Sequence, residues 1–504
     1  MPAGLFVLSR RKVVAPCNGR GFAMPRSRFR RGQPLTFAHI STWRFAMTMF
    51  SRAVHATTLA GTALLAAFSI APPASAQTLK LEADLGNTVV NTSKAGSVYL
   101  RLNLKSAANK NAARRAPINV AIVIDKSGSM DGDRIAAAKQ GARVALERLS
   151  ADDTVALVAY DHNVNILSAS APLRSSRERL EKAIDGLQAG GTTALYGGVQ
   201  EGGRQVEKYI SDNNVNRVIL LSDGLANVGP SQPHDLAQLG RKLASKGITV
   251  STIGLGLDYN EDLMQRLAAA SDGNHVFVER PSDLAEIFDR EFGDALSVAA
   301  RDITITIECR SGFTPKRILG RDGDIEGQRV TLKLNQLQAD NERYVIVELD
   351  APSGRATGAA DVADISISYA DLVDGGRQAN ANSKASIEFS ADAKAVERGI
   401  NKSVMSQVTE QIATENTERA VDLRDKGDLA AAKKTLEDNA AYIRSSREYY
   451  SSGSTPASTA AISKLNDMES KSRDAASNLD AGSWDRTRKM MRHDQHKAKV
   501  QQAY

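Results

Sequence analysis

Acidic and hydroxyl side chains follow two long apolar runs of the sequence. Asp125, Ser127 and Ser129 stand at alternate positions at the end of INVAIVIDKSGS, and Asp223 ends VNRVILLSD. Carboxylate and hydroxyl oxygens are the hard ligands that Mg²⁺ prefers in proteins. Two acids held together away from water would repel each other, and a divalent cation would relieve that repulsion. These residue types therefore predict a divalent-metal site.

The elements around these residues explain how they would meet. Both apolar runs are typical of buried strands, and in an open α/β sheet functional groups gather beyond the carboxyl ends of the strands. Gly128 lets the backbone curl between the two serines, and the helix expected from about Met130 turns its positive end toward the same place. The loop Gly190-Gly191-Thr192-Thr193 ends in hydroxyls just before another expected helix, so it is a third source of oxygen ligands.

Residues 117–297 alternate between strand patterns and helix patterns. Continuous apolar runs such as DTVALVAY and ITVSTIGLG are typical of strands that are covered on both faces, and RIAAAKQGARVALERL has helical spacing. This alternation predicts a doubly wound, mostly parallel α/β domain.

The segments on either side of this domain have a different pattern. In SVYLRLNLK, residues 97–105, apolar and polar side chains alternate, and ITITIEC, RVTLKLNQL, RYVIVELD and DISISYADL repeat the alternation after residue 300. A period of two is typical of antiparallel sheets with one wet face. We expect residues 77–116 and 298–391 to form one β-sandwich domain into which the α/β domain is inserted.

Residues 392–504 have a helical and charged pattern. ERAVDLRDKGDLAAAKKTLEDNAAYI predicts helix, turn and helix, with Gly427 in the turn and Asp428 as an N-cap; SSGSTPAS predicts a linker before a further helix. The basic end RTRKMMRHDQHKAKVQQAY is expected to fray. We therefore interpret His493 and His496 as residues of a solvated tail and not as a zinc site.

The first 76 residues predict export. They contain ten Lys or Arg and no Asp or Glu, so without them the 65 basic residues fall to 55 against 58 acidic ones, a formal charge of −3. Positive charge at Arg52, the short apolar run LAGTALLAAFSIA and the sequence Ala74-Ser75-Ala76 have the form of a secretory signal peptide that is cleaved after Ala76. The alternative is a single uncleaved anchor. We expect that the start codon is assigned too far upstream, so that residues 1–46 are not part of the natural protein and Met47 or Met49 is its first residue.

The chain after Ala76 has the features of an exported protein, periplasmic or secreted. No later segment reaches 18 consecutive apolar residues, so we expect no transmembrane segment in the mature chain. Only Cys309 would remain after cleavage, because Cys17 lies in the removable part, and an intramolecular disulfide is then excluded. The arginine-rich start is not interpreted as an arm that binds nucleic acid.

These motifs resemble the von Willebrand factor type A (VWA) family. Asp125-x-Ser127-x-Ser129 is similar to its D-x-S-x-S metal motif, GGTTALYGG resembles the loop that supplies a threonine, and LLSDG resembles the strand end that supplies a second aspartate. The resemblance implies a VWA fold, similar to Rossmann folds, with a metal ion-dependent adhesion site (MIDAS).

By this resemblance, the metal ligands are Asp125, Ser127, Ser129, Thr193 and Asp223, with Thr192 as the alternative to Thr193. The metal is Mg²⁺, with Mn²⁺ or Ca²⁺ as alternatives that the motif does not separate. The flanking segments resemble exported bacterial proteins often described as calcium-activated chloride channel homologues. We expect no channel activity, because the mature sequence offers no membrane span.

The predicted function is protein–protein recognition through the metal, which would bind an Asp or Glu of a partner protein. We expect no enzyme activity, since G-x-S-x-G and H-E-x-x-H motifs are absent from the sequence. One alternative is a helical and β scaffold of an envelope complex with a vestigial metal site. Another is an Mg²⁺-dependent hydrolase, in which an aspartate at a strand end acts as the nucleophile.

Overall fold

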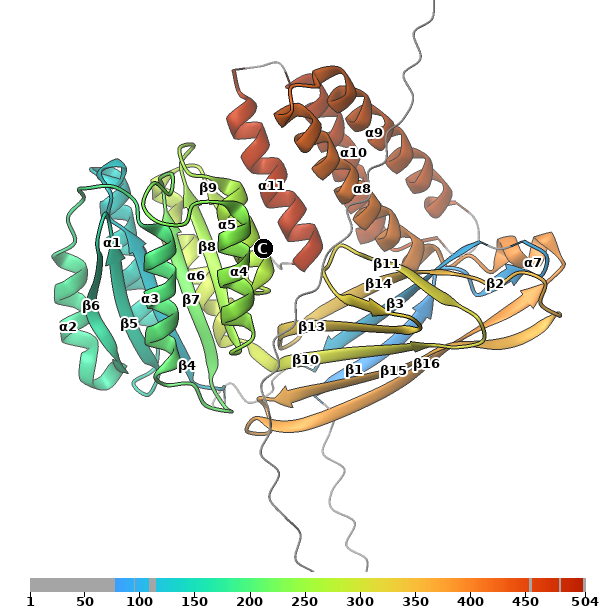
Figure 1. Ribbon diagram of the computed structural model, residues 1–504, viewed down its shortest axis with the longest axis horizontal. Helices are drawn as coiled ribbons and strands as arrows, with labels where there is room; N and C mark the ends of the chain where they lie inside the picture. Colours follow the sequence, from blue (N-terminus) through green and yellow to red (C-terminus); the bar gives the residue numbers. More distant parts are fainter. Residues whose placement is uncertain (1–77, 95, 108–114, 453–455, 480–481, 502–504) are drawn as a thin grey trace, which may run out of the picture. The chain divides into compact units, whose positions relative to one another are not determined.

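The computed structural model describes residues 78–94, 96–107, 115–452, 456–479 and 482–501. They form an α/β domain, a β-sandwich and a helical C-terminal region (Figure 1). The predicted fold class is confirmed in these three respects. The predicted signal peptide and the expected N-terminal extension lie outside the described residues.

The α/β domain is built on a six-stranded sheet of order β6-β5-β4-β7-β8-β9. All neighbouring strands are parallel except β5 and β6, which are antiparallel. The sequence prediction named no strand at β6, an edge strand that carries the exposed Ile166. The bounds are β4 Ile118–Asp125, β5 Thr154–Tyr160, β6 Val164–Pro172, β7 Val215–Ser222, β8 Ile248–Leu255 and β9 His275–Val278.

Helices cover both faces of this sheet, which explains why its central strands are apolar throughout. Alternate residues of β4 point to opposite faces: Ile122 and Ile124 belong to one core, and Ala121 and Val123 to the other. The first core is closed by α1 Asp133–Arg148, α2 Leu173–Asp185 and α6 Leu284–Leu296. The second is closed by α3 Leu195–Glu207, α4 Pro233–Ala244 and α5 Glu261–Ala270.

The β-sandwich combines strands from both sides of the α/β domain. One sheet has the order β1-β3-β14-β11 and the other β12-β13-β10-β15-β16-β2. The bounds are β1 Leu79–Leu85, β2 Val89–Asn91, β3 Ser97–Ser106, β10 Val298–Cys309, β11 Thr314–Leu319, β12 Asp324–Glu326, β13 Arg329–Gln338, β14 Glu342–Asp350, β15 Gly358–Asp371 and β16 Arg377–Ser390. Since β3 pairs antiparallel with β14, the α/β domain is an insertion in one sandwich.

Five helices form the C-terminal region in the part of the chain that the structure describes. They are α7 Ala393–Arg398, α8 Lys402–Asp425, α9 Leu429–Ser451, α10 Thr459–Ser477 and α11 Trp484–Val500. The turn between α8 and α9 has the expected chemistry: Gly427 adopts a φ of +86°, and the Asp428 side chain accepts a hydrogen bond from the N–H of Ala431. No described helix combines the length and apolar character needed to cross a bilayer.

The prediction of a frayed C-terminal tail is wrong. Helix α11 packs against α5 and β9 of the α/β domain (Figure 1). Lys489 is buried, and its Nζ donates to the carbonyl oxygen of Tyr259 at 2.8 Å and to Glu261 at 2.6 Å. The interpretation of His493 and His496 as solvated is also wrong. Polar side chains of α11 are buried against polar partners, so no apolar stripe in the sequence reveals the contact.

Three histidines meet where α11 contacts β9. The Nδ1 of His493 lies 3.0 Å from the carbonyl oxygen of His275, and the Nε2 of His496 lies 2.8 Å from that of Gly273. The Nδ1 of His275 lies 2.9 Å from the hydroxyl of Thr252. Burial lowers the pKa of all three imidazoles, that of His496 to about 3. The three rings are therefore neutral at pH 7.

We predict that acid weakens this contact. A histidine whose pKa falls below its unfolded value of about 6.5 binds fewer protons when folded, so its stabilising contribution is lost as the pH falls below that value. Between pH 7.5 and pH 5 the free energy of unfolding should fall by roughly 1–2 kcal/mol through His496 alone. Urea unfolding at a series of pH values measures this fall.

Replacing His496→Gln should reduce the pH dependence, because the glutamine amide can still donate to Gly273 but does not titrate. The matched control is His234→Gln, which changes a histidine whose side chain is 79% exposed. Equal pH dependence in the wild type and in His496→Gln would contradict the assignment.

Candidate functional site

The site lies at the point where the strand order of the α/β sheet reverses. Strands β4 and β7 are neighbours, but the chain leaves β4 toward α1 on one face and reaches β7 after α3 on the other. Such a switch point opens a crevice at the carboxyl ends of the strands. Asp125 is the last residue of β4, and Asp223 directly follows β7. Both aspartates are fully buried.

Hydrogen bonds connect the two aspartates through the serines. Asp125 accepts from the N–H of Ser127 at 2.8 Å and from the hydroxyl of Ser222 at 2.6 Å. The hydroxyl oxygens of Ser127 and Ser129 are 3.1 Å apart, and the Ser129 hydroxyl donates to Asp223 at 2.7 Å. Four of the five predicted ligands thus form one connected cluster.

The loop before α3 is held against the Asp125–Ser129 segment by backbone hydrogen bonds. The N–H of Gly128 donates to the carbonyl oxygen of Gly191 at 3.0 Å, and the N–H of Gly190 donates to that of Lys126 at 2.8 Å. Gly191 has a φ of +82°, and a Cβ there would lie 2.5 Å from Nδ1 of His162. Only glycine fits this position without displacing a neighbour.

Of the two threonines in this loop, Thr193 is the buried one. Its side chain is 3% exposed, whereas Thr192 is exposed. A Cβ added to Gly224 would lie 3.2 Å from both Ser129 Oγ and Thr193 Oγ1, and 3.7 Å from Ser127 Oγ. The three hydroxyl oxygens therefore converge beside the backbone of Gly224. The geometry favours Thr193 as the threonine of the site, and its role as a metal ligand stays a prediction.

Two buried carboxylates so close together require compensation. Burial raises the pKa of Asp125 to about 6, although hydrogen bonds from Ser222 and Ser127 oppose the rise. The guanidinium of Arg134, on α1, compensates Asp223: its Nη1 lies 2.5 Å from Asp223 Oδ2, and its Nη2 lies 3.0 Å from Asp258 Oδ2. Positive charge is thus supplied to this crevice from the chain itself.

The donor set fits a hard divalent cation. Two carboxylates and three hydroxyls supply oxygen alone, as Mg²⁺ and Ca²⁺ require. Within the described residues, no group of three or more His, Cys, Asp or Glu side chains could hold a metal ion. A metal site at this crevice therefore depends on the serine and threonine hydroxyls as well as on the two aspartates.

Sequence reasoning missed three residues that shape the site. Ser222 donates to Asp125, Arg134 pairs with Asp223, and Asn227 accepts through Oδ1 from the N–H of Thr193 at 2.8 Å. Ser222 could have been found, because it is the hydroxyl next to Asp223 in LLSDG. Arg134 and Asn227 carry no local signal, since their roles depend on how distant segments meet.

The strand order and the oxygen-lined crevice define a doubly wound α/β protein with its candidate site at the switch point. Residues 119–290 match the family model of the von Willebrand factor type A domain. This segment of the chain is therefore identified as a VWA domain, as its motifs predict, and VWA domains mediate protein–protein interactions.

Relatives and solved structures agree with this assignment. An uncharacterized protein of Synechocystis sp. is 28% identical over 47% of this chain and 58% of its own length. The uncharacterized protein YfbK of Escherichia coli is 30% identical over 38% of this chain and 33% of its own length. The structure of a von Willebrand factor type A protein from Catenulispora acidiphila has a TM-score of 0.61 at 18% identity, over 74% of this chain and 87% of that one. This last likeness concerns the fold.

The hydrogen bond from Ser222 to Asp125 yields a prediction about stability. Replacing Ser222→Ala leaves a buried carboxylate oxygen without its donor, which should lower the free energy of unfolding by about 1.5–3 kcal/mol. Urea unfolding at pH 7.5 in EDTA measures the loss. Ser245→Ala, at the exposed end of α4, is the control and should change stability by less than about 0.5 kcal/mol. Equal stabilities for the two variants would show that the Ser222 hydroxyl does not support Asp125.

Proposed function

We propose that this VWA-domain protein is a non-enzymatic recognition protein that binds an acidic side chain of a partner protein through a divalent metal ion. The observation that carries the proposal is the convergence of three hydroxyl oxygens beside Gly224, next to two buried aspartates. Together, the hydroxyls and the carboxylates come from three separate segments of the chain: residues 125–129, Thr193 and Asp223. A capping turn would need the oxygens of one segment only.

The metal-binding residues in this proposal are Asp125, Ser127, Ser129, Thr193 and Asp223. When bound, the metal would supply a Lewis-acidic position that attracts an outside carboxylate. The two aspartates roughly balance the charge of a divalent ion, so the site does not repel an incoming acid. Mg²⁺ prefers six oxygen ligands, and five protein oxygens leave room for another. Mn²⁺ and Ca²⁺ stay alternatives.

The surroundings of the cluster suit a protein partner. Ser129 is exposed, whereas Asp125 and Asp223 lie beneath the surface. Leu225 is 58% exposed just after β7, and Leu257 is 42% exposed just after β8. Large apolar side chains exposed near one edge of a sheet are typical of interaction surfaces. We infer that the partner presents an apolar side chain near its acid.

The hydrolase alternative is disfavoured by the burial of Asp125. A phosphoryl-transfer nucleophile must reach its substrate, but Asp125 has no exposed surface and both of its oxygens accept hydrogen bonds from this chain. We therefore propose that the aspartate holds a ligand and does not react.

A scaffold role with a vestigial site is the second candidate. The observation that favours it is the ion pair between Arg134 and Asp223, which compensates one buried carboxylate without any metal. In that case the protein would bind partners through its other surfaces. In either role we propose an exported location, periplasmic or secreted, on the basis of the signal-like sequence that ends at Ala76.

Metal binding separates the two candidates. We expect the wild type to bind Mn²⁺, detected by electron paramagnetic resonance or calorimetry, and Asp125→Ala to weaken binding at least tenfold because a charged ligand is lost. Capture of a partner from an envelope extract should require Mg²⁺, fail in EDTA and fail with Asp125→Ala. Asp152→Ala, in the turn before β5, is the matched control. If neither EDTA nor Asp125→Ala changes the amount of captured partner, the scaffold role is favoured.

The exposed leucine offers a test of partner contact that leaves the metal ligands intact. Leu225→Ser should lower Mg²⁺-dependent capture several-fold, because apolar surface is lost from the interface, while Mn²⁺ affinity stays within twofold of the wild type. Leu429→Ser, at the start of α9, removes a leucine that is 38% exposed in another domain and is the control. Equal capture by both variants would remove Leu225 from the proposed interface.

A further inference from the structure

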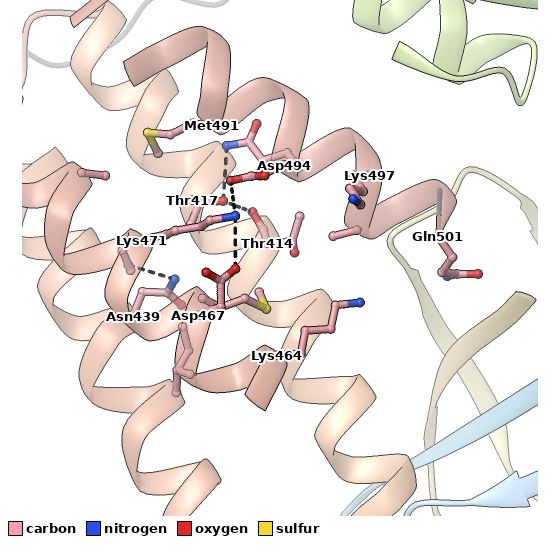
Figure 2. Close-up of a pocket in the computed structure, with 16 residues that line it drawn as sticks. Thr414, Thr417, Asn439, Lys464, Asp467, Lys471, Met491, Asp494, Lys497 and Gln501 are labelled. Carbon is pink, nitrogen blue, oxygen red and sulfur yellow. Dashed lines mark hydrogen bonds and ion pairs between the residues drawn. The ribbon is translucent and has the colours of Figure 1, made fainter. Parts of the chain in front are cut away.

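A cavity of about 300 Å³ lies among four helices of the C-terminal region, far along the chain from the VWA site. Its walls come from α8, α9, α10 and α11, and Gln501, directly after α11, also lines it (Figure 2). This volume lies at the lower limit for pockets that bind small molecules in proteins, about 300–1,000 Å³. The cavity is therefore large enough for a small organic ligand.

Three lysines face this cavity, and one of them has no partner. Lys471 pairs with Asp467 at 3.1 Å and with Asp494 at 3.0 Å, as Figure 2 shows. Lys464 pairs with Glu410 at 2.5 Å. Among the described residues, no hydrogen bond or ion pair involves the ammonium group of Lys497. The cavity thus holds one uncompensated positive charge.

The surroundings of Lys497 disfavour its charge. Burial lowers the pKa of this ammonium group; Asp494 opposes the effect, and the positive charges of Lys471, Lys464 and Arg290 add to it. An ammonium group that is partly removed from water and surrounded by like charges gains from any anion placed beside it. Asp494, the acid that acts on Lys497, is already paired with Lys471.

Apolar side chains and hydrogen-bonded polar groups make up much of the remaining lining. Ile443, Met468 and Met491 contribute hydrophobic surface, and methionine side chains adapt to ligands of varied shape. The buried polar groups have partners within the chain: Asn439 donates to the carbonyl oxygen of Ala413, and the Ser472 hydroxyl donates to that of Leu436. The cavity therefore offers one charged contact, the ammonium group of Lys497, and an apolar surface for the rest of a ligand.

We propose that this cavity binds a small organic anion, a carboxylate with a short apolar chain, whose charged group pairs with Lys497. The unpaired ammonium group of Lys497 beside apolar side chains, in a cavity of this volume, carries the proposal. A metal cation is disfavoured because lysines surround the space. This binding site shares no residue with the VWA site, so each proposal can fail without the other.

The probe for the test is octanoate, measured by calorimetry and by saturation-transfer NMR on the full chain. We expect octanoate to bind the wild type, and octanamide, which has the same chain without the charge, to bind at least fivefold more weakly. Inorganic phosphate, which has charge without an apolar chain, should also bind at least fivefold more weakly than octanoate.

The matched variants are Lys497→Met and Lys499→Met, both on α11. Lys497→Met should weaken octanoate binding at least fivefold and should fold normally, because Lys497 makes no ion pair that would be lost. Lys499 pairs with Glu418 and does not line the cavity, so Lys499→Met should leave the affinity within twofold. Thermal unfolding checks that both variants are folded.

The proposal would be overturned by the absence of octanoate binding to the wild type, by equal binding of octanoate and octanamide, or by unchanged octanoate affinity in folded Lys497→Met. Phosphate binding as tight as that of octanoate would show that the apolar walls contribute nothing, and would equally reject the organic anion as the ligand.

Discussion

The VWA site depends on one electrostatic constraint: two carboxylates, Asp125 and Asp223, are buried at the ends of neighbouring strands. Buried charge of one sign is costly unless hydrogen bonds and opposite charge offset it. The hydroxyl of Ser222 and the N–H of Ser127 donate hydrogen bonds to Asp125. The hydroxyl of Ser129 donates to Asp223, and Arg134 forms an ion pair with Asp223. Each of these groups must be in place for the strands to end as they do, so the crevice is shaped by the need to satisfy two acids.

The same constraint recurs where the domains meet. Asp272, directly after α5 and its C-cap residue, is buried and pairs with Arg321 and Arg343 of the sandwich at 3.1 and 2.8 Å, and their charges help to hold its pKa below the usual value despite burial. Helix α11 adds Lys489, which binds Glu261 at the other end of α5. The inserted VWA domain is thus joined to its host by charged pairs as well as by the chain itself. Removing one partner of such a pair leaves a buried charge uncompensated.

The sequence predicted those elements of the fold in which apolar residues form a long run or recur at a regular spacing. The apolar runs of β4 and β7 and the alternation of β3 follow directly from burial, and Leu100, Leu102 and Leu104 are all fully buried. Strand β16 was missed because its inward residues include small alanines among many polar ones. Helix α11 was misread because Lys489, Arg492 and His496 are buried against polar partners.

Prediction of the site had the same limit. The resemblance to VWA motifs identified five side chains, and the structure brings them together, but Arg134 and Asn227 act across distances that no local pattern encodes.

The ion pair of Arg134 with Asp223 determines whether the domain can fold before a metal ion binds. Because a guanidinium from the same chain offsets the charge of Asp223, the domain has no need to meet an ion before it folds. A newly made polypeptide can therefore reach its native structure in a solution of any mineral content, and an ion at the proposed metal site would bind afterwards. Folding and loading would then be separate events in the life of the molecule.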